Sequence, residues 1–267
     1  HNDDGSARID MTIAYHLPDE QPVLREQRTI SISAPDATGA YFIDWQATFT
    51  PAGEHDVVWD RMVHNFALPD CADEDESLQW AQWYADHPDY MARIFKRAQP
   101  WIYYIVDELE RRGMPGEIAL LPIVESAYDP FAFSSGRALG AWQFIASTGR
   151  NYGLNQDWWY DGRRDVWSST QAALDYLEHL HNKFDGDWLL ALAGYNSGEN
   201  RVAREVKKNL KKGKPGDFWN LELPAETQSY VPKLMALRAI IQNPHDYNIS
   251  LPTLSDSSYF TTVEIRK

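Results

Sequence analysis

The first part of the chain alternates apolar and polar residues with a period of two. Segments 9–15, 28–33 and 41–49 each place an apolar side chain at nearly every second position, which is typical of strands that bury one face. Segments 17–20 and 34–39 separate them with Pro, Asp and Gly, which favour turns. The pattern predicts three β-strands. Because three strands without a covering layer are only marginally stable, we expect a piece of a β-sandwich, or a sheet that packs against something else.

After about residue 57 the apolar positions follow the helical period of 3.6. Pro100 suits a first helical turn, Gly113 suits a helix stop, and Asp187 can cap a helix that begins at Trp188. A last short strand is predicted near the end of the chain, over 259–265. The predicted helices cover 88–97, 100–112, 115–124, 169–184, 188–193, 199–212 and 225–242.

Composition restricts the class of partner. The formal net charge of −14 argues against a nucleic acid, because phosphate binding needs a cationic surface. The chain contains 11 Trp. Indole rings often line sites where a flat apolar face meets a polar ligand such as a sugar, although they also fill protein cores.

The sequence lacks the residues that several kinds of chemistry need. One cysteine, Cys71, excludes a disulfide within the chain. The histidines show no metal spacing, since His179 and His181 lie two apart and cannot share a helix face, so we expect no metal and no cofactor. No apolar stretch approaches the roughly 20 residues that span a bilayer. The sequence begins without a recognisable leader, and we expect any export signal or lipid anchor to lie outside it.

Glu125 is the first candidate for chemistry. It stands at the end of the apolar segment 118–124 and just before the turn-forming pair Asp129-Pro130. Apolar surroundings disfavour the ionised carboxylate, so its pKa is expected to be raised. A carboxyl that stays protonated near neutrality can protonate a leaving glycosidic oxygen. The alternative is a helix-end glutamate that reaches out to water.

Three further motifs follow Glu125-Ser126 in order: Gly140-Ala-Trp-Gln143, Ala193-Gly-Tyr195-Asn196 and Glu226-Thr-Gln-Ser-Tyr230. Together they resemble the lytic transglycosylases with the soluble-type catalytic domain, most closely the membrane-bound D-type members, over residues 59–243. The resemblance implies a mainly α, lysozyme-like fold of the goose-type and soluble lytic transglycosylase kind, preceded by the N-terminal β segment. It divides the chain into a β-rich segment over 1–57 (an incomplete or fused module), a catalytic domain over 58–249, and a linker or strand over 250–267.

The resemblance also implies roles for single residues. Glu125 matches the catalytic acid and base. A substrate-binding or supporting role falls on Ser126, Gly140, Trp142, Gln143, Tyr195, Asn196 and Tyr230. Gly194 stands where the family usually has alanine, which leaves the match intact. Packing alternatives remain for three of these positions, because Tyr195 and Tyr230 suit a core and Asn196 suits a helix C-cap.

The activity implied is that of an exo- or endo-acting lytic transglycosylase. Such an enzyme cleaves the β-1,4 bond between N-acetylmuramic acid and N-acetylglucosamine and leaves 1,6-anhydromuramoyl ends. Peptidoglycan strands are the implied partner, at the periplasmic side of the bacterial cell envelope, with any membrane attachment through segments outside this sequence. Two alternatives stay open: a hydrolytic goose-type lysozyme in which Asp161 or Asp165 positions a water, and a non-catalytic glycan-binding module. Residues 1–57 resemble a fragment of the methane oxygenase PmoA-like β family.

Overall fold

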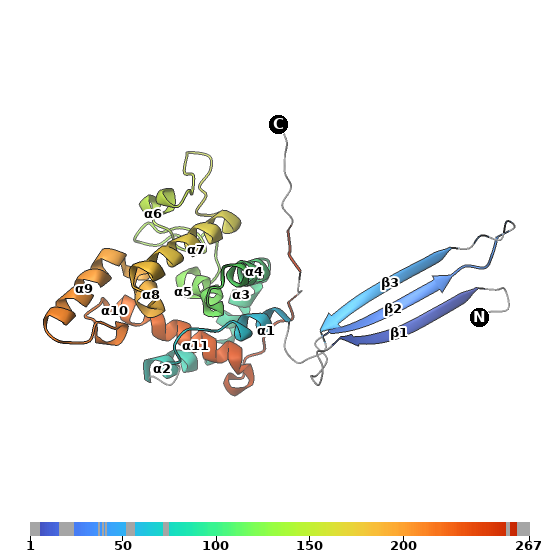
Figure 1. Ribbon diagram of the computed structural model, residues 1–267, viewed down its shortest axis with the longest axis horizontal. Coiled ribbons are helices and arrows are strands. Elements are labelled where there is room, and N and C mark those ends of the chain that lie inside the picture. The colour runs from blue at the N-terminus through green and yellow to red at the C-terminus, as the bar shows by residue number, and fades with distance from the viewer. Residues whose placement is uncertain are drawn as a thin grey trace. The chain divides into compact units, whose positions relative to one another are not determined.

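The computed structural model describes residues 6–15, 24–36, 38, 40, 42–51, 57–71, 75–254 and 257–260. The chain divides into two compact units, His1–Val57 and Val58–Lys267 (Figure 1). The first unit is a β-sheet and the second is helical. The predicted fold class, mainly α with an N-terminal strand segment, is confirmed.

The first unit is an antiparallel sheet of β1 (Ala7–Tyr15), β2 (Leu24–Ile32) and β3 (Ile43–Pro51), in the order β1-β2-β3. The three predicted strands are therefore confirmed, although β3 begins two residues after the predicted start, and Tyr41 lies outside the described residues. The register aligns Ile9, Ile30 and Trp45 in one row across the sheet. Trp45 is 62% exposed, so this apolar row has no complete cover among the described residues.

The second unit is built from short helices joined by compact turns. In chain order they are α1 (Val57–His64), α2 (Asp75–Ala85), α3 (Pro88–Ala98), α4 (Ile102–Arg112), η1 (Gly116–Leu120), α5 (Leu121–Ser126), α6 (Ala146–Asn151), α7 (Val166–Lys183), α8 (Trp188–Ser197), α9 (Glu199–Lys211), η2 (Phe218–Asn220), α10 (Ala225–Gln228), α11 (Tyr230–Gln242) and η3 (Pro244–Tyr247). Among the described residues, no helix is both long enough and apolar enough to cross a bilayer.

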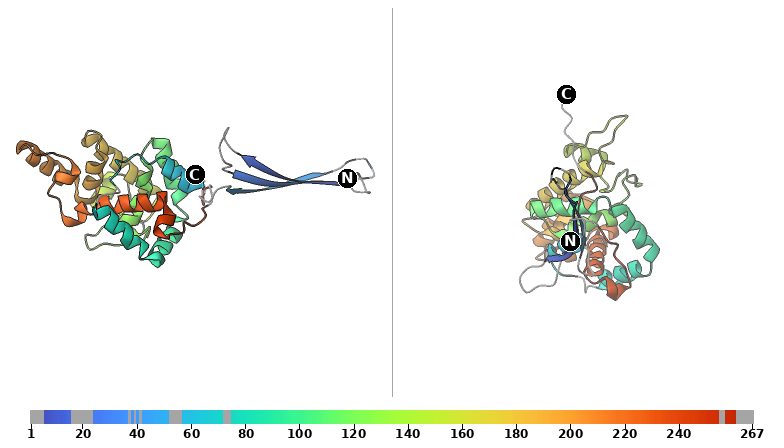
Figure 2. Two further views of the ribbon diagram at one scale, coloured as in Figure 1. Left: turned by 90° about the horizontal axis from the view of Figure 1, so that it is seen from below. Right: turned by 90° about the vertical axis from the view of Figure 1, so that its right-hand side faces the viewer.

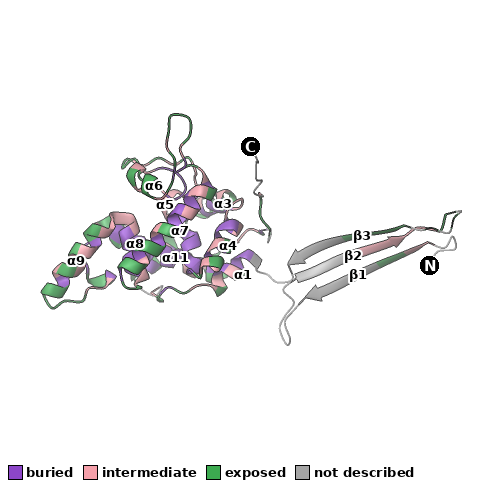
Figure 3. Cartoon of the chain, turned by 45° about the horizontal axis from the view of Figure 1, so that its top comes forward, coloured by how far each residue is buried: buried purple, intermediate pink, exposed green. Residues whose placement is uncertain are grey.

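Two apolar helices, α8 and α11, form the centre of the helical unit. Every residue from 189 to 194 in α8 is buried, and so is most of α11 (Figure 3). A helix that is apolar on all sides must be enclosed by others. α11 packs against α2, α5, α8 and α10, and α7 covers α8; Figure 2 shows α11 within the unit from two further sides. Leu234 and Leu237 are fully buried, and each such side chain contributes about 1.5–3 kcal/mol.

Most predicted helix ends agree with the structure. Gly113 ends α4 in the left-handed conformation with φ 64°. Asp187 caps α8 by accepting a hydrogen bond from the Leu190 N–H. α7 begins at Val166, three residues earlier than predicted, because the Asp165 carboxylate accepts from the Ser168 N–H at 2.9 Å and caps it. The Asp165 cap therefore fixes a helix start that periodicity alone left open.

Other predicted boundaries were wrong. The helix predicted over 225–242 is interrupted at Ser229. Pro232 has no N–H for the carbonyl of Gln228 and its ring crowds that carbonyl, which explains the break. α8 continues to Ser197, four residues past its predicted end. At the predicted strand over 259–265, Tyr259 and Phe260 are not in a strand, and the remaining residues lie outside the described part.

Candidate active site

A cleft of about 410 Å³ opens in the helical unit between segments that are far apart in the sequence. Its size falls in the usual range for ligand-binding sites. Five residues singled out from the sequence motifs line it: Glu125, Gln143, Tyr195, Asn196 and Tyr230. The other lining residues are Val124, Ser134, Ala138, Phe144, Ile145, Thr148, Tyr176, Ser197, Gly198, Glu226 and Lys233.

Glu125 is carried by the last turn of α5. The first half of this helix, Leu121 to Ile123, is buried in the core. The helix stops because Ala127 and Tyr128 both take left-handed conformations, with φ of 53° and 57°. The Tyr128 ring is fully buried, and its hydroxyl donates to the Ala119 carbonyl at 2.6 Å. The reversal is thus fixed from within the core, and it holds Glu125 at the edge of the cleft.

Burial of the Glu125 carboxyl raises its pKa to about 7, and the negative charge of Glu226 acts in the same direction. The Tyr230 hydroxyl donates a hydrogen bond to Oε1 of Glu125 at 2.5 Å and partly opposes this rise. A pKa near 7 means that the protonated and the ionised form are both well populated near neutrality. Such a carboxyl can give a proton in one step and take one in the next.

The loop after α5 runs so close to the backbone of Arg163 that no side chain fits at Gly140. Gly140 has φ +86°, and a Cβ there would lie 1.8 Å from the Arg163 carbonyl oxygen. Only glycine fits this place. Gln143 also has a positive φ, 50°, and its Nε2 donates to the carbonyl oxygens of Gly140 at 2.8 Å and Ala132 at 3.2 Å. These bonds fix the Gln143 amide in the wall of the cleft.

Trp142 is a correction to the predicted site. Its indole is fully buried, and Nε1 donates to Oγ1 of Thr170 at 2.9 Å, so the side chain belongs to the core and does not face the cleft. Trp142 contributes through its backbone instead. Its carbonyl oxygen accepts a hydrogen bond from the Tyr195 hydroxyl at 2.8 Å.

Ser126 does not line the cleft either. Its hydroxyl lies 2.8 Å from the Ala141 carbonyl oxygen and 3.2 Å from that of Pro122. It also accepts a hydrogen bond from the Asp129 N–H at 3.2 Å. Ser126 therefore ties the end of α5 to the loop that contains Gly140, and this position suits a supporting role.

Tyr195 and Asn196 occupy the last turn of α8. The Tyr195 ring packs against Phe144 and Tyr176, and burial raises the pKa of its hydroxyl well above the ordinary tyrosine range. Oδ1 of Asn196 accepts from Oγ1 of Thr227 at 2.7 Å, which links α8 to α10. The C-cap interpretation of Asn196 was wrong, because Gly198 occupies that position.

Asp161 and Asp165, which the hydrolytic alternative needs, lie outside the cleft lining, and so does Asp129 after the catalytic motif. Asp161 forms an ion pair with Arg163, which holds the pKa of that carboxyl below its usual range. Asp165 caps α7. Asp129 accepts a hydrogen bond from a backbone N–H and pairs with Arg97 at 3.1 Å. The described residues contain no group of three His, Cys, Asp or Glu that could hold a metal ion.

Two charged residues of the cleft, Glu226 and Lys233, were assigned no role from the sequence. Glu226 is exposed at the start of α10. Nζ of Lys233 lies 4.5 Å from the centre of the Trp80 ring. Glu226 stands at the head of the fourth motif, but nothing in the sequence distinguishes it from an ordinary acidic residue in a first helical turn.

Comparison with known proteins gives two family matches. Residues 103–217 match the model described as Transglycosylase SLT domain. Residues 1–67 match one described as Family of unknown function (DUF6807), and the resemblance of this segment to the PmoA-like family stays a prediction.

Among curated proteins, membrane-bound lytic murein transglycosylase D of Escherichia coli K12 is 48% identical over 193 residues, which cover 72% of this chain and 43% of that protein. The putative tributyltin chloride resistance protein of Alteromonas sp. is 41% identical over 148 residues, or 55% of this chain and 71% of that protein. A solved structure, an inactive mutant of the lytic transglycosylase Slt from Pseudomonas aeruginosa, shows 23% identity and a TM-score of 0.41 over 72% of this chain and 33% of that one. The chain thus spans less than half the length of the E. coli relative.

Proposed function

The chain belongs to the transglycosylase SLT family, as its motifs predict, and we propose on that premise that it cleaves the glycan strands of peptidoglycan as a lytic transglycosylase. One observation carries the proposal: the Glu125 carboxyl has a pKa of about 7 in a cleft of ligand size and accepts a hydrogen bond from Tyr230. An acid that must also act as a base works best with a pKa near the working pH.

The proposed reaction uses this one carboxyl twice. Protonated Glu125 gives its proton to the β-1,4 glycosidic oxygen between N-acetylmuramic acid and N-acetylglucosamine, and the bond from C1 to that oxygen breaks. The Glu125 carboxylate then takes the proton of the muramoyl C6 hydroxyl, whose oxygen bonds to C1. The products are a free 4-hydroxyl and a 1,6-anhydromuramoyl end, and no water is consumed. An intramolecular nucleophile has a high effective concentration, so no second carboxylate is needed to activate water.

The alternatives fit the cleft less well. A hydrolytic lysozyme needs a second carboxylate that flanks the scissile bond, and the two aspartates expected in that role are outside the cleft lining, Asp161 in an ion pair and Asp165 in a helix cap. The other carboxylate that does line the cleft is Glu226, and with it present the match to the transglycosylase SLT domain favours the lyase. A module that only binds glycan has no use for a carboxyl with a pKa of about 7 at the wall of its groove. We therefore favour the lyase reaction over both.

The proposal also assigns the catalytic domain and the cellular place. Every residue of the cleft lies within 124–233, inside the predicted catalytic domain of 58–249. The glycan strands of peptidoglycan surround the cell outside the inner membrane, so we place the chain at the periplasmic side of the bacterial envelope.

The products of sacculus digestion test the proposal. We expect mass spectrometry to find anhydromuramoyl ends, which are one water lighter than reducing ends. Glu125→Gln keeps the shape of the side chain but removes the acid, so cleavage should fall at least about a hundredfold while sacculus binding remains. Reducing ends would instead support a hydrolase. A variant that keeps more than about a tenth of the activity would remove Glu125 from the mechanism.

A further inference from the structure

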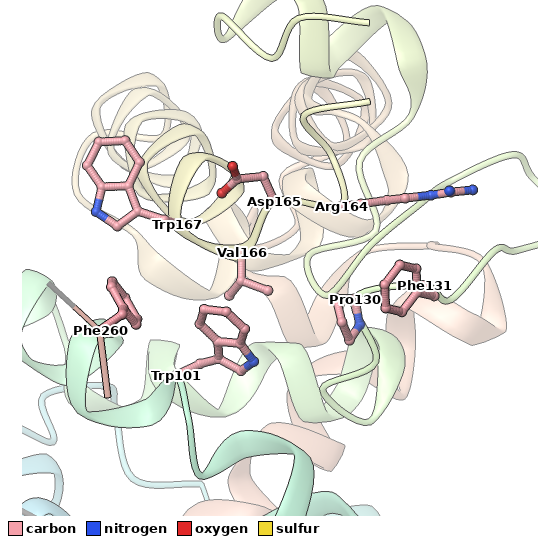
Figure 4. Close-up of a pocket in the computed structure, with 8 residues that line it drawn as sticks. All are labelled: Trp101, Pro130, Phe131, Arg164, Asp165, Val166, Trp167 and Phe260. Carbon is pink, nitrogen blue, oxygen red and sulfur yellow. The ribbon is translucent and has the colours of Figure 1, made fainter. Parts of the chain in front are cut away.

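A second hollow of about 440 Å³ lies in the helical unit and shares no lining residue with the cleft. Aromatic rings from four separate segments surround it (Figure 4). We call it the aromatic pocket, and its lining residues are Trp101, Pro130, Phe131, Arg164, Asp165, Val166, Trp167 and Phe260. Figure 4 shows Val166 between Trp101, Trp167 and Phe260 on one side and Phe131 on the other.

Two of the four rings of the aromatic pocket are exposed to solvent. Phe131 is 71% exposed and Trp167 is 44% exposed. Trp101 and Phe260 are half-buried and contact each other, with ring centres 5.6 Å apart. Exposed apolar surface that is collected in one place marks a binding site more often than scattered single residues do.

The loop before α7 adds to this aromatic surface. It carries Trp158 and Trp159, each 83% exposed, followed by Tyr160, whose hydroxyl donates to the Asp165 carboxylate at 3.1 Å. The loop is ordered, because Oδ1 of Asp157 accepts from the N–H groups of residues 159 and 160 at 2.7 and 2.8 Å. Its two tryptophans are thus presented to solvent by a fixed turn next to a residue of the aromatic pocket.

Of the two charged side chains at the rim, Arg164 and Asp165, only Arg164 can bind an anionic group of a ligand. The Asp165 carboxylate already accepts hydrogen bonds from the Ser168 N–H and the Tyr160 hydroxyl. Arg164 is exposed, and no ion pair of its guanidinium occurs among the described residues. A guanidinium can bind a carboxylate through two hydrogen bonds, and aromatic faces suit the flat apolar face of a sugar ring.

We propose that the aromatic pocket is a second, non-catalytic glycan site, which binds a sugar ring with a neighbouring carboxylate. The inference rests on the proposed function, because it assigns the pocket to the same polymer that the cleft would cut. Asp165 lies in the lining, and Asp157 and Asp161 belong to the loop before it. These carboxylates would repel the many negative charges of an anionic lipid surface, whereas the single carboxylate of a sugar ligand needs only Arg164 as its partner. A second site on a polymeric substrate raises the local concentration of strand at the cleft.

Binding of the full chain carrying Glu125→Gln, which leaves the strands intact, tests the proposal. Trp167→Ala should weaken binding to sacculi and to chitin, a neutral polymer of N-acetylglucosamine, by about three- to tenfold. Arg164→Gln should weaken binding to sacculi and leave chitin binding unchanged. Trp219→Ala is the matched control, because Trp219 is also 44% exposed but belongs to η2 and not to the pocket.

Glycan strands stripped of their peptides identify the carboxylate. In these strands the lactyl groups of the sugars are the only acidic groups, so a persistent effect of Arg164→Gln assigns the carboxylate to the sugar. Loss of the effect assigns it to the peptide, and both results support the pocket. Thermal melts of the variants check folding, and Arg164→Gln keeps the test valid if Trp167→Ala is destabilised.

Two results would overturn the proposal. One is binding of both pocket variants equal to that of the Trp219→Ala control. The other is that the pocket variants bind vesicles of anionic phospholipid less well than the unmodified pocket does, while their binding to glycan is unchanged. Failure of the proposed function looks different: the unmodified chain would then release no fragments from sacculi, whatever the pocket variants do to binding. In chains that keep Glu125, turnover of a short soluble glycan that fills only the cleft should be the same with and without Trp167→Ala.

Discussion

Replacing Tyr230 by Phe removes one hydroxyl from the cleft and leaves the ring in place. That hydroxyl donates to Oε1 of Glu125 at 2.5 Å and stabilises the ionised carboxylate. A hydrogen bond to a charged group is worth about 1.5–3 kcal/mol, and about 1.4 kcal/mol corresponds to one pKa unit. The pKa of Glu125, about 7 in the unmodified chain, should therefore rise by roughly one to two units in Tyr230→Phe.

The pH dependence of kcat/KM measures this change. Under the proposed reaction, the basic limb of this pH profile follows loss of the proton that Glu125 donates. In the unmodified chain the limb should lie near pH 7, well above the roughly 4.3 of a free glutamate. In Tyr230→Phe the limb should move to higher pH, because a raised pKa keeps the carboxyl protonated over a wider range. The maximum rate should fall as well, because the carboxylate formed in the first step has lost its donor.

The control for this experiment is Tyr176→Phe. Tyr176 also lines the cleft, but it is not among the groups that shift the pKa of Glu125. The basic limb of Tyr176→Phe should stay where it is in the unmodified chain. A limb that stays near pH 7 or moves to lower pH in Tyr230→Phe would refute the reasoning, and so would a limb near pH 4 in the unmodified chain.

Three further predictions concern the electrostatics and the frame of the cleft. Glu226→Gln removes a negative charge that raises the pKa of the proposed acid, so the basic limb should move to lower pH, and an unmoved limb would count against this coupling. Gly140→Ala places a Cβ 1.8 Å from a carbonyl oxygen and should cost about 2 kcal/mol or more in denaturant unfolding, with most of the activity lost. Gly136→Ala in the same loop, where the nearest atom is 3.6 Å away, should leave both unchanged. Glu117→Ala leaves the N–H groups of Ala67 and Leu68 without their acceptor and half-buried Arg238 without the nearer of its two carboxylates, and it should lower the free energy of unfolding by about 2–4 kcal/mol; a loss below about 1 kcal/mol would show that water replaces the carboxylate.

The sequence located much of the cleft because its residues come in short motifs. Glu125, Gln143, Tyr195, Asn196 and Tyr230 were all expected in one site, and all five line the cleft. The raised pKa of Glu125 also followed from its place at the end of an apolar segment. These predictions depend only on local sequence. An apolar run, a glycine in a tight turn and an aromatic residue near a helix end indicate the same local structure whatever the rest of the fold is.

Inferences that depend on the direction of a side chain did not hold as well. Trp142 and Gln143 are neighbours in one motif, yet the indole enters the core and the amide enters the cleft. The left-handed conformation of Gln143 is more common for glycine and asparagine than for glutamine, so nothing in the sequence indicated it. Glu226 was not predicted because its effect is not local. It acts on the pKa of Glu125, which lies about a hundred positions away in the sequence. The break before α11 could have been foreseen from Pro232.

The bond between Glu125 and Tyr230 joins residues 105 positions apart, and this separation sets when the acid can work. A chain under synthesis emerges from its N-terminus, and domains fold as units once their parts are present. Until α11 has emerged, Glu125 lacks both the core that raises its pKa and the hydroxyl that binds it, and it behaves as an ordinary surface glutamate. The raised pKa of Glu125 therefore belongs to the complete fold alone, and the carboxyl acquires it only when the last central helix is in place.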